Sequence, residues 1–192
     1  MPTSFLRALV LDIAMLAAIS LSAHAGDEVT WRNLPRDITL DIDRDGKPDR
    51  ALLIDTEGGS ADLYIYLGAG DGLLDPSRKP DVLKKSLTAS LVHTFEANKK
   101  GSLVIMYGCG GCANTTATTL TIVHRDGAFR VGGYSYGWDT RDFGTGTCDI
   151  NFLTGKGTLS KDGGRTRPIR AALKPVTLAD WSEETHVRGC GF

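Results

Sequence analysis

The sequence has no concentration of positive charge, and this absence narrows the classes of partner that it can have. The 192 residues carry a formal net charge of -1, with no region rich in Lys and Arg. Nucleic acids and acidic membrane surfaces bind proteins through clustered cations, so we exclude both as partners. Low-complexity tracts and linker-like runs are also absent, and we expect one folded domain of ordinary size after any processing.

Catalytic motifs are equally scarce. Only His93, His124 and His186 follow residue 25, and none lies in an HExxH or nucleophile-elbow context. We interpret each of them as a surface or strand histidine. Asp139 and Asp142 are candidate acids for a hydrolase, although acids three residues apart beside glycine are common in turns.

The single long apolar run lies near the N-terminus and is typical of a secretory signal peptide. Arg7 precedes an apolar stretch from about Ala8 to Leu21, and an Ala-His-Ala motif ends at Ala25. A transmembrane anchor is the alternative, but the stretch is shorter than the ~20 residues of a bilayer span, and Asp12 interrupts it. We predict that residues 1–25 are removed, that no membrane span remains, and that the protein is periplasmic or secreted.

Short apolar runs separated by Asp-Gly and Gly-Gly pairs predict strands joined by tight turns across residues 26–192, which we expect to form a single β-rich domain. In the segment LYIYL (63–67), aliphatic residues alternate with tyrosines, as on the two faces of a strand. Asp126 and Gly127 supply the positive φ angles of a hairpin turn. The predicted fold class is mainly β (β-rich α+β), with antiparallel sheets and hairpins. Further predicted strands are 102–107, 118–123 and 128–136.

One or two short helices complete this prediction. Leu83, Leu87 and Leu91 form a stripe with helical spacing within residues 81–91, although a strand is the alternative there. Thr177 is followed three positions later by Asp180, a pattern typical of a helix start. We therefore predict a short helix around residues 178–185.

The most specific motif is an aspartate-rich loop, DIDRDGKPD, at residues 41–49. Carboxylates at positions 1, 3, 5 and 9, with glycine at position 6, suit a loop that wraps oxygen atoms around one hard cation. The carbonyl oxygen at position 7 would add a further ligand. We predict a Ca²⁺ site of weak affinity, about 10⁻⁴ to 10⁻³ M, and a metal-free Asp-Gly turn is the alternative. The predicted ligands are Asp41, Asp43, Asp45, Lys47 (through its backbone) and Asp49.

Position 12 of this loop is Leu52, where a helix-loop-helix calcium site would have a bidentate Glu. We therefore expect a strand after the loop. The loop, the apolar run 51–54 and the segment LYIYLGAGDG (63–72) resemble the calcium-binding unit of FG-GAP and VCBS-type repeats over about residues 38–90. The resemblance implies the ligand positions, but a propeller needs several such units and only one is visible.

Four cysteines, Cys109, Cys112, Cys148 and Cys190, follow the predicted signal peptide. An even number in an exported chain predicts two disulfides, and the sequence leaves all three pairings open. A redox role for the CxxC pair is disfavoured, because the chain runs from it into another predicted strand and not into a helix. Zinc binding by the four cysteines is a further alternative.

These features predict an exported calcium-binding β-rich module that is not an enzyme and binds an envelope or extracellular protein or glycan. Residues 134–144 mix aromatics, acids and glycine, a composition typical of a recognition loop. Two alternatives remain: a periplasmic inhibitor or immunity protein, and a secreted hydrolase in which calcium is only structural.

Overall fold

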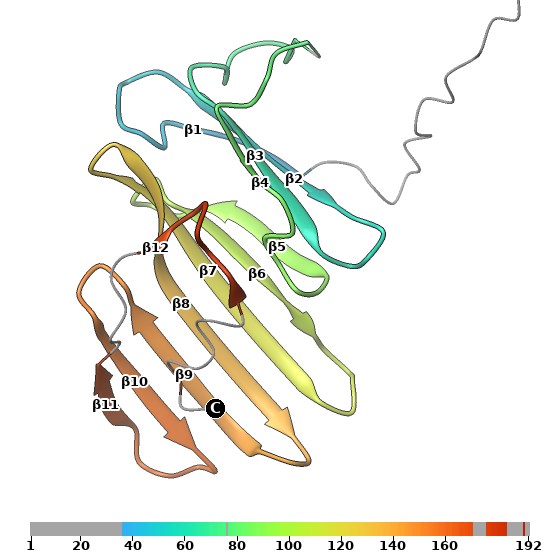
Figure 1. The fold of residues 1–192 in the computed structure, drawn as a ribbon, viewed down its shortest axis with the longest axis vertical. Coiled ribbons are helices and arrows are strands. Elements are labelled where there is room, and N and C mark those ends of the chain that lie inside the picture. Colours follow the sequence, from blue (N-terminus) through green and yellow to red (C-terminus); the bar gives the residue numbers. More distant parts are fainter. Residues whose placement is uncertain (1–35, 76, 171–175, 184–189, 191–192) are drawn as a thin grey trace, which may run out of the picture.

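The protein consists of antiparallel strands arranged in two sheets of unequal size (Figure 1). A computed structural model describes residues 36–75, 77–170, 176–183 and 190. The predicted signal peptide lies outside this part of the chain. The mainly β fold class and the antiparallel sheets are confirmed.

The smaller sheet has four strands in sequential order and carries the aspartate loop between its first two strands. In β2, Ala51 and Leu53 are fully buried whereas Leu52 and Ile54 are half-buried on the opposite face, as period-two alternation requires. The strand expected after the loop is thus present. The strands are β1 (Arg36–Leu40), β2 (Asp49–Asp55), β3 (Ala61–Tyr66) and β4 (Val82–Lys84).

The larger sheet contains eight strands. Seven of them lie in the order β11-β10-β9-β8-β7-β6-β5, and β12 pairs with β8 off this path. Asp126 (φ 53°) and Gly127 (φ 71°) form the tight turn between β7 and β8, which confirms the predicted hairpin. The strands are β5 (Val92–Ala97), β6 (Leu103–Cys109), β7 (Thr115–Arg125), β8 (Ala128–Thr140), β9 (Gly144–Asn151), β10 (Lys156–Lys161), β11 (Arg167–Arg170) and β12 (Val176–Thr177).

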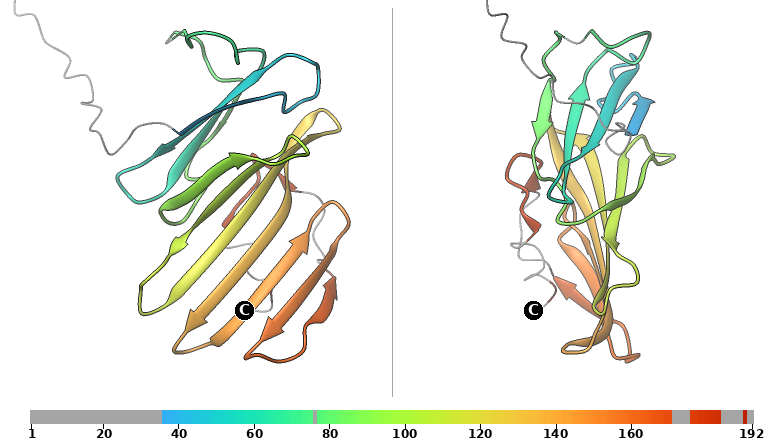
Figure 2. Two further views of the ribbon diagram at one scale, coloured as in Figure 1. Left: turned by 180° about the vertical axis from the view of Figure 1, so that it is seen from behind. Right: turned by 90° about the vertical axis from the view of Figure 1, so that its right-hand side faces the viewer.

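One face of the larger sheet is apolar and covered, and we call it the inner face. Side chains such as Ile105, Leu120 and Ile150 are buried there in one core cluster that also includes Leu53 and Leu63 of the smaller sheet. Each such side chain contributes about 1.5–3 kcal/mol on burial. Seen edge-on in Figure 2, the C-terminal segment lies along one side of the larger sheet.

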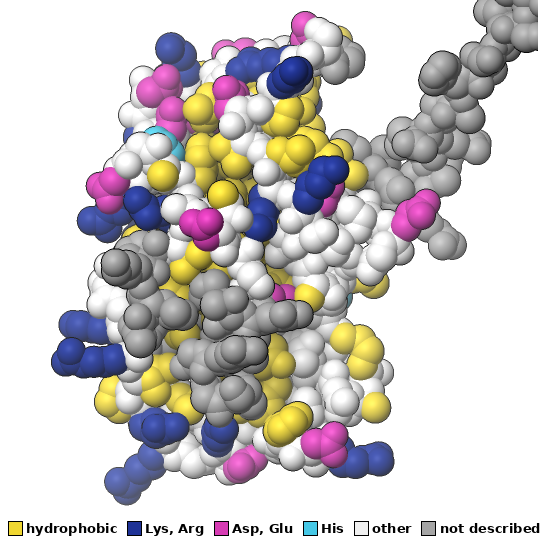
Figure 3. Space-filling model, viewed as in Figure 1, with side chains coloured by type: hydrophobic (Ala, Val, Ile, Leu, Met, Phe, Trp, Pro, Cys, Tyr) yellow, Lys and Arg dark blue, Asp and Glu magenta, His cyan; other side chains and the backbone are white. Residues whose placement is uncertain are grey.

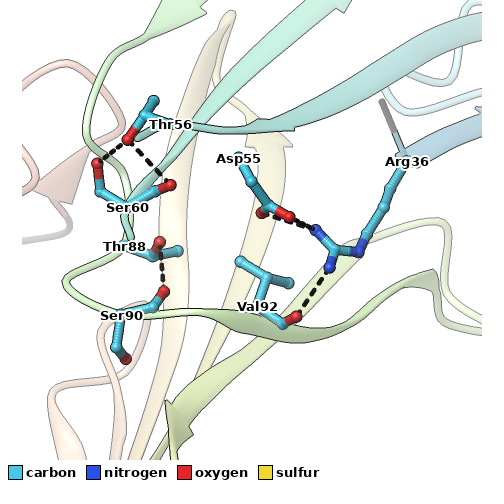
Figure 4. A network of polar contacts seen from close by, with 7 residues as sticks. All are labelled: Arg36, Asp55, Thr56, Ser60, Thr88, Ser90 and Val92. Carbon is cyan, nitrogen blue, oxygen red and sulfur yellow. Dashed lines mark hydrogen bonds and ion pairs between the residues drawn. The ribbon is translucent and has the colours of Figure 1, made fainter. Parts of the chain in front are cut away.

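A polar contact joins the two sheets where β1 and β2 approach β5 (Figure 4). The Arg36 guanidinium donates to both carboxylate oxygens of Asp55, at 2.7 and 2.9 Å, and to the carbonyl oxygen of Val92 at 2.9 Å. The planar guanidinium suits this arrangement because its donors diverge from one rigid fork. The contact therefore fixes the start of β5 against the smaller sheet.

The expected helix within residues 81–91 is wrong: this segment contains β4 and turns. Pairing of Leu83 with Tyr64 in β3 overrides the weak helical stripe. At the second predicted helix, Asp180 donates its N–H to Thr177 Oγ1 at 3.2 Å, as in a helix cap, yet residues 178–182 are not helical. Within the predicted helix, Glu183 is the one described residue with a helical conformation. Residues 184–185 of that prediction lie outside the described part of the chain.

Two disulfides are present, and they join Cys109 to Cys112 and Cys148 to Cys190. The first closes the loop between β6 and β7. The second links the buried Cys148 of β9 to a position near the C-terminus, 42 residues away in sequence. With all four cysteines bonded, no thiolate is left for the alternative zinc site.

The two disulfides should contribute unequally to stability. Replacing Cys148 and Cys190 with serine is expected to lower the free energy of unfolding by about 4 kcal/mol, because this bridge closes a long loop in the unfolded chain. The same change at Cys109 and Cys112 should cost less than about 2 kcal/mol. Urea denaturation of both double variants measures the difference, and equal losses would contradict it.

Candidate metal centre

The aspartate loop spans residues 41–48 and turns the chain between β1 and β2. The Gly46 N–H donates to Asp41 Oδ2 at 3.1 Å, and the Asp45 N–H donates to Asp43 Oδ1 at 3.1 Å. Gly46 has a φ of 87°, a conformation that glycine adopts without a steric penalty. Backbone amides thus direct the carboxylates toward the middle of the loop.

Asp49 ends the aspartate motif at the start of β2, and it is the only carboxylate of the motif with no exposed surface. Its Oδ2 accepts the Ile42 N–H at 2.8 Å, and its Oδ1 accepts the Gly68 N–H at 2.8 Å. One side chain therefore joins the start of the loop to the end of β3. Hydrogen bonds of this kind make a buried carboxylate tolerable, since each oxygen has a donor.

Carboxylates of Asp41, Asp43 and Asp49 converge, with one oxygen from each lying within 4.8 Å of the others. At such separations each pair of charges repels by about 1 to 4 kcal/mol near a surface. Asp41 Oδ1 is buried and has no hydrogen-bond partner. A hard cation would both relieve the repulsion and satisfy this oxygen, so the three carboxylates could hold a metal ion.

Asp45 is the predicted carboxylate that lies outside this group. Its Oδ2 forms an exposed ion pair with Lys47 Nζ at 3.4 Å. Lys47 also donates its N–H to Asp45 Oδ1 at 2.8 Å, and this hydrogen bond lowers the pKa of the Asp45 carboxyl. The structure thus brings together three of the four predicted carboxylates.

Cations near the loop are held by other partners. Arg44 donates to the carbonyl oxygen of Lys100 at 3.1 Å, in the turn between β5 and β6. Arg50 forms an ion pair with Asp37 on β1 and donates to the carbonyl oxygen of Gly72 at 3.1 Å. Neither of these contacts therefore neutralises the three converging carboxylates.

The glycine-rich segment after β3, which is the second part of the FG-GAP-like pattern, packs on the loop. The Gly70 N–H donates to the carbonyl oxygen of Pro48 at 2.8 Å. A Cβ atom at Gly70 would lie 2.5 Å from Pro48 Cβ and 2.7 Å from Thr39 Cγ2. Only glycine permits this approach, so the two parts of the sequence pattern meet in space.

Asp139 and Asp142, the predicted hydrolase acids, lie at one end of the larger sheet and away from the loop. Asp139 is exposed on β8, paired with Thr115 and Thr145 of the neighbouring strands, and Asp142 is exposed in the turn before β9. Within the predicted recognition segment 134–144, Tyr134 and Trp138 belong to the core, whereas Phe143 is 67% exposed. The aromatic residues are thus split between the core and the surface.

A shallow hollow of about 430 Å³ lies on the outer face of the larger sheet, across β7 to β10. Its polar side chains alternate along the strands with the buried inner-face residues, and Gly133 leaves room at its centre. The alternation of polar and apolar residues is visible in the sequence, but the sequence does not show that these four strands lie side by side. The hydroxyl, amide and charged side chains that line the hollow are those of Thr119, Thr121, Ser135, Asp149, Asn151, Lys156 and Thr158.

Sequence reasoning also missed Glu183, which lies in the C-terminal segment and has a partly buried side chain. Burial raises the pKa of its carboxyl, while the nearby Tyr107 and Thr118 side chains and the Ala89 backbone oppose the shift. No sequence signal marks this residue, because its neighbours come from strands far away in the chain.

No family model matches the chain, and no curated protein or solved structure is significantly similar to it.

Asp49 should be needed for stability even without a metal ion. Asp49→Ala is expected to lower the free energy of unfolding in chelator by about 2–4 kcal/mol, because two amides then lose their acceptor in a buried setting. Asp43→Ala is the matched control and should cost less than about 1 kcal/mol under the same conditions. Urea denaturation with chelator present measures both, and similar losses for the two variants would contradict the assignment.

Proposed function

We propose that the protein is an exported calcium-binding β-rich module that binds another component of the envelope or extracellular space and does not catalyse a reaction. The observation that carries the calcium site is the convergence of Asp41, Asp43 and Asp49, of which Asp41 also has a buried carboxylate oxygen without a hydrogen-bond partner. The FG-GAP-like pattern of the sequence supports the same ion.

Two disulfides favour an oxidising compartment, the periplasm or the extracellular space. Among the described residues, no helix has the length and apolar character needed to cross a membrane. On the face drawn in Figure 3, basic and acidic side chains are interspersed. This supports a protein or glycan partner more than a polyanion.

The bound ion would act mainly on stability and loop geometry. In place of mutual repulsion, the three carboxylates would share one divalent charge, and the loop would hold the start of β2 against the end of β3. An affinity of about 10⁻⁴ to 10⁻³ M, typical of extracellular modules, suits a compartment with abundant calcium.

Calcium should therefore stabilise the folded protein. In 10 mM Ca²⁺, the oxidised protein is expected to gain about 1–3 kcal/mol over the protein in chelator. Calorimetric titration should show one site that Asp43→Ala removes, whereas Asp71→Ala, which removes an exposed carboxylate outside the group, should keep it. The same titration of Asp45→Ala shows whether Asp45 is a ligand. Identical melting of the wild type in calcium and chelator would refute the proposal.

The outer-face hollow is the surface that best supports a binding role. Its hydroxyls, amide and charged groups offer donors and acceptors side by side, as recognition of a polyhydroxyl ligand requires. No described element covers it, because the smaller sheet and the C-terminal segment pack on the inner face (Figure 2).

A glycan partner predicts amide shifts confined to this hollow when ¹⁵N-labelled protein is titrated with a panel of neutral oligosaccharides. Ser135→Trp fills the hollow and should abolish the shifts. Thr145→Trp places the same side chain on the exposed part of β9 outside the hollow and should preserve them. Absence of shifts with every oligosaccharide would remove glycans and leave an envelope or extracellular protein as the partner.

A further inference from the structure

The C-terminal segment 176–183, which we call the strap, lies on the inner face of the larger sheet. Its first residues form β12 beside β8, and the Leu178 N–H donates to the carbonyl oxygen of Phe129 at 2.8 Å. Trp181 is buried, and its ring centroid lies 5.7 Å from that of Tyr134 and 6.1 Å from that of Phe152. The strap is therefore part of the core cover.

Lys84 holds the strap from the smaller sheet. Its ammonium donates to the carbonyl oxygens of Ala179 at 3.0 Å and of Trp181 at 2.7 Å. These carbonyls would serve as acceptors inside a helix, and here they bind a side chain from another sheet. The charge of Lys84 is thus committed to the backbone of the strap.

Glu183, at the end of the strap, projects over a row of inner-face residues. The strand register places Tyr107, Thr118, Tyr136 and Cys148 side by side across β6 to β9. Thr118 Oγ1 donates to Glu183 Oε1 at a long 3.4 Å. Cys148, in the same row, carries the disulfide to Cys190. The Glu183 carboxyl therefore contacts the row at the end of the strap, and the disulfide attaches Cys190 to the same row.

The polar groups around this carboxyl are incompletely satisfied. Glu183 Oε2 is buried without a hydrogen-bond partner, and so are the hydroxyls of Tyr107 and Tyr134, whose side chains are 1% and 2% exposed. The Tyr107 hydroxyl is close enough to act on the carboxyl but forms no hydrogen bond of regular geometry with it. In these surroundings the neutral form of the Glu183 carboxyl is favoured, because a buried charge without full compensation is costly.

No cation among the described residues pairs with Glu183. Lys84 is bound to carbonyl oxygens, Lys85 is exposed on the rim of the adjoining hollow, and Asp180 is held by Thr177 at 2.6 Å. The titratable groups that face the carboxyl from the sheet are Tyr107, Tyr134 and Tyr136, all neutral at ordinary pH.

We propose that Glu183 is a proton-dependent latch: its neutral carboxyl closes the end of the strap onto the inner face, and its ionisation loosens the end of the strap from that face. The inference is independent of the calcium site, which lies in a different sheet. It gives the fold a region whose closure depends on the pH of the surrounding compartment.

The direction follows from the burial of the carboxyl. Burial raises the pKa of Glu183 in the closed state above its value in the open or unfolded chain. Closure is therefore most favourable below the unfolded pKa, and this advantage is lost as the pH rises through the folded pKa. Loosening would widen the hollow of about 410 Å³ that lies between residues 84–89 and 181–183 and would expose Tyr134 and Phe152.

Hydrogen exchange of the full oxidised chain between pH 4 and pH 8 tests the latch. After correction for intrinsic exchange rates, protection of the amides of residues 178–183 is expected to fall several-fold with rising pH, because the buried carboxyl becomes charged. Glu183→Gln cannot ionise and should show constant protection. Glu96→Gln, the same change at an exposed position on β5, should behave as the wild type.

A second measurement requires no variant. The ¹³C shift of the Glu183 side-chain carboxyl, followed by pH titration, should have a midpoint above that of the exposed Glu96 in the same spectra. Coincident midpoints would overturn the proposal, and so would strap protection that changes with pH to the same extent in the wild type and in Glu183→Gln.

Discussion

The inner face of the larger sheet has to be shielded from water, and the rest of the structure is organised around this requirement. A single antiparallel sheet buries its apolar face only if another layer covers it. Here the cover comes from two separate parts of the chain, the smaller sheet at one end and the C-terminal segment elsewhere. Each cover needs its own attachment, which Arg36 provides for the first and Lys84, Glu183 and the Cys148–Cys190 disulfide provide for the second.

The candidate calcium site obeys a related constraint, because it too concentrates groups that are unfavourable on their own. Backbone amides and Asp49 hold the loop in a conformation in which carboxylates converge. The stability of the loop therefore rests partly on ordinary hydrogen bonds and, in our proposal, partly on an ion. In our further proposal, Glu183 presents a similar balance beside residues 84–89, with a proton in place of the ion.

Local patterns predicted the strands and the hairpin well. Alternation in residues 63–67 and the Asp126-Gly127 pair depend on backbone geometry within a few residues, and both appear in the structure. The helical spacing of leucines in residues 81–91 gave a wrong prediction, because pairing of Leu83 with Tyr64 in the smaller sheet outweighed a weak local preference for helix. The Thr177–Asp180 cap formed without its helix, since Lys84 binds the carbonyl oxygens that the helix would need.

The sequence by itself determined the loop, its carboxylates and the alternation of the strands, because these depend on neighbours within a few residues. Only the tertiary structure decided that Asp49 reaches Gly68, that Asp45 stays outside the converging group, and that the cysteines pair as they do. It also placed Glu183 over Thr118, 65 residues away in sequence. Such contacts depend on the order of strands in a sheet, which no short-range periodicity encodes.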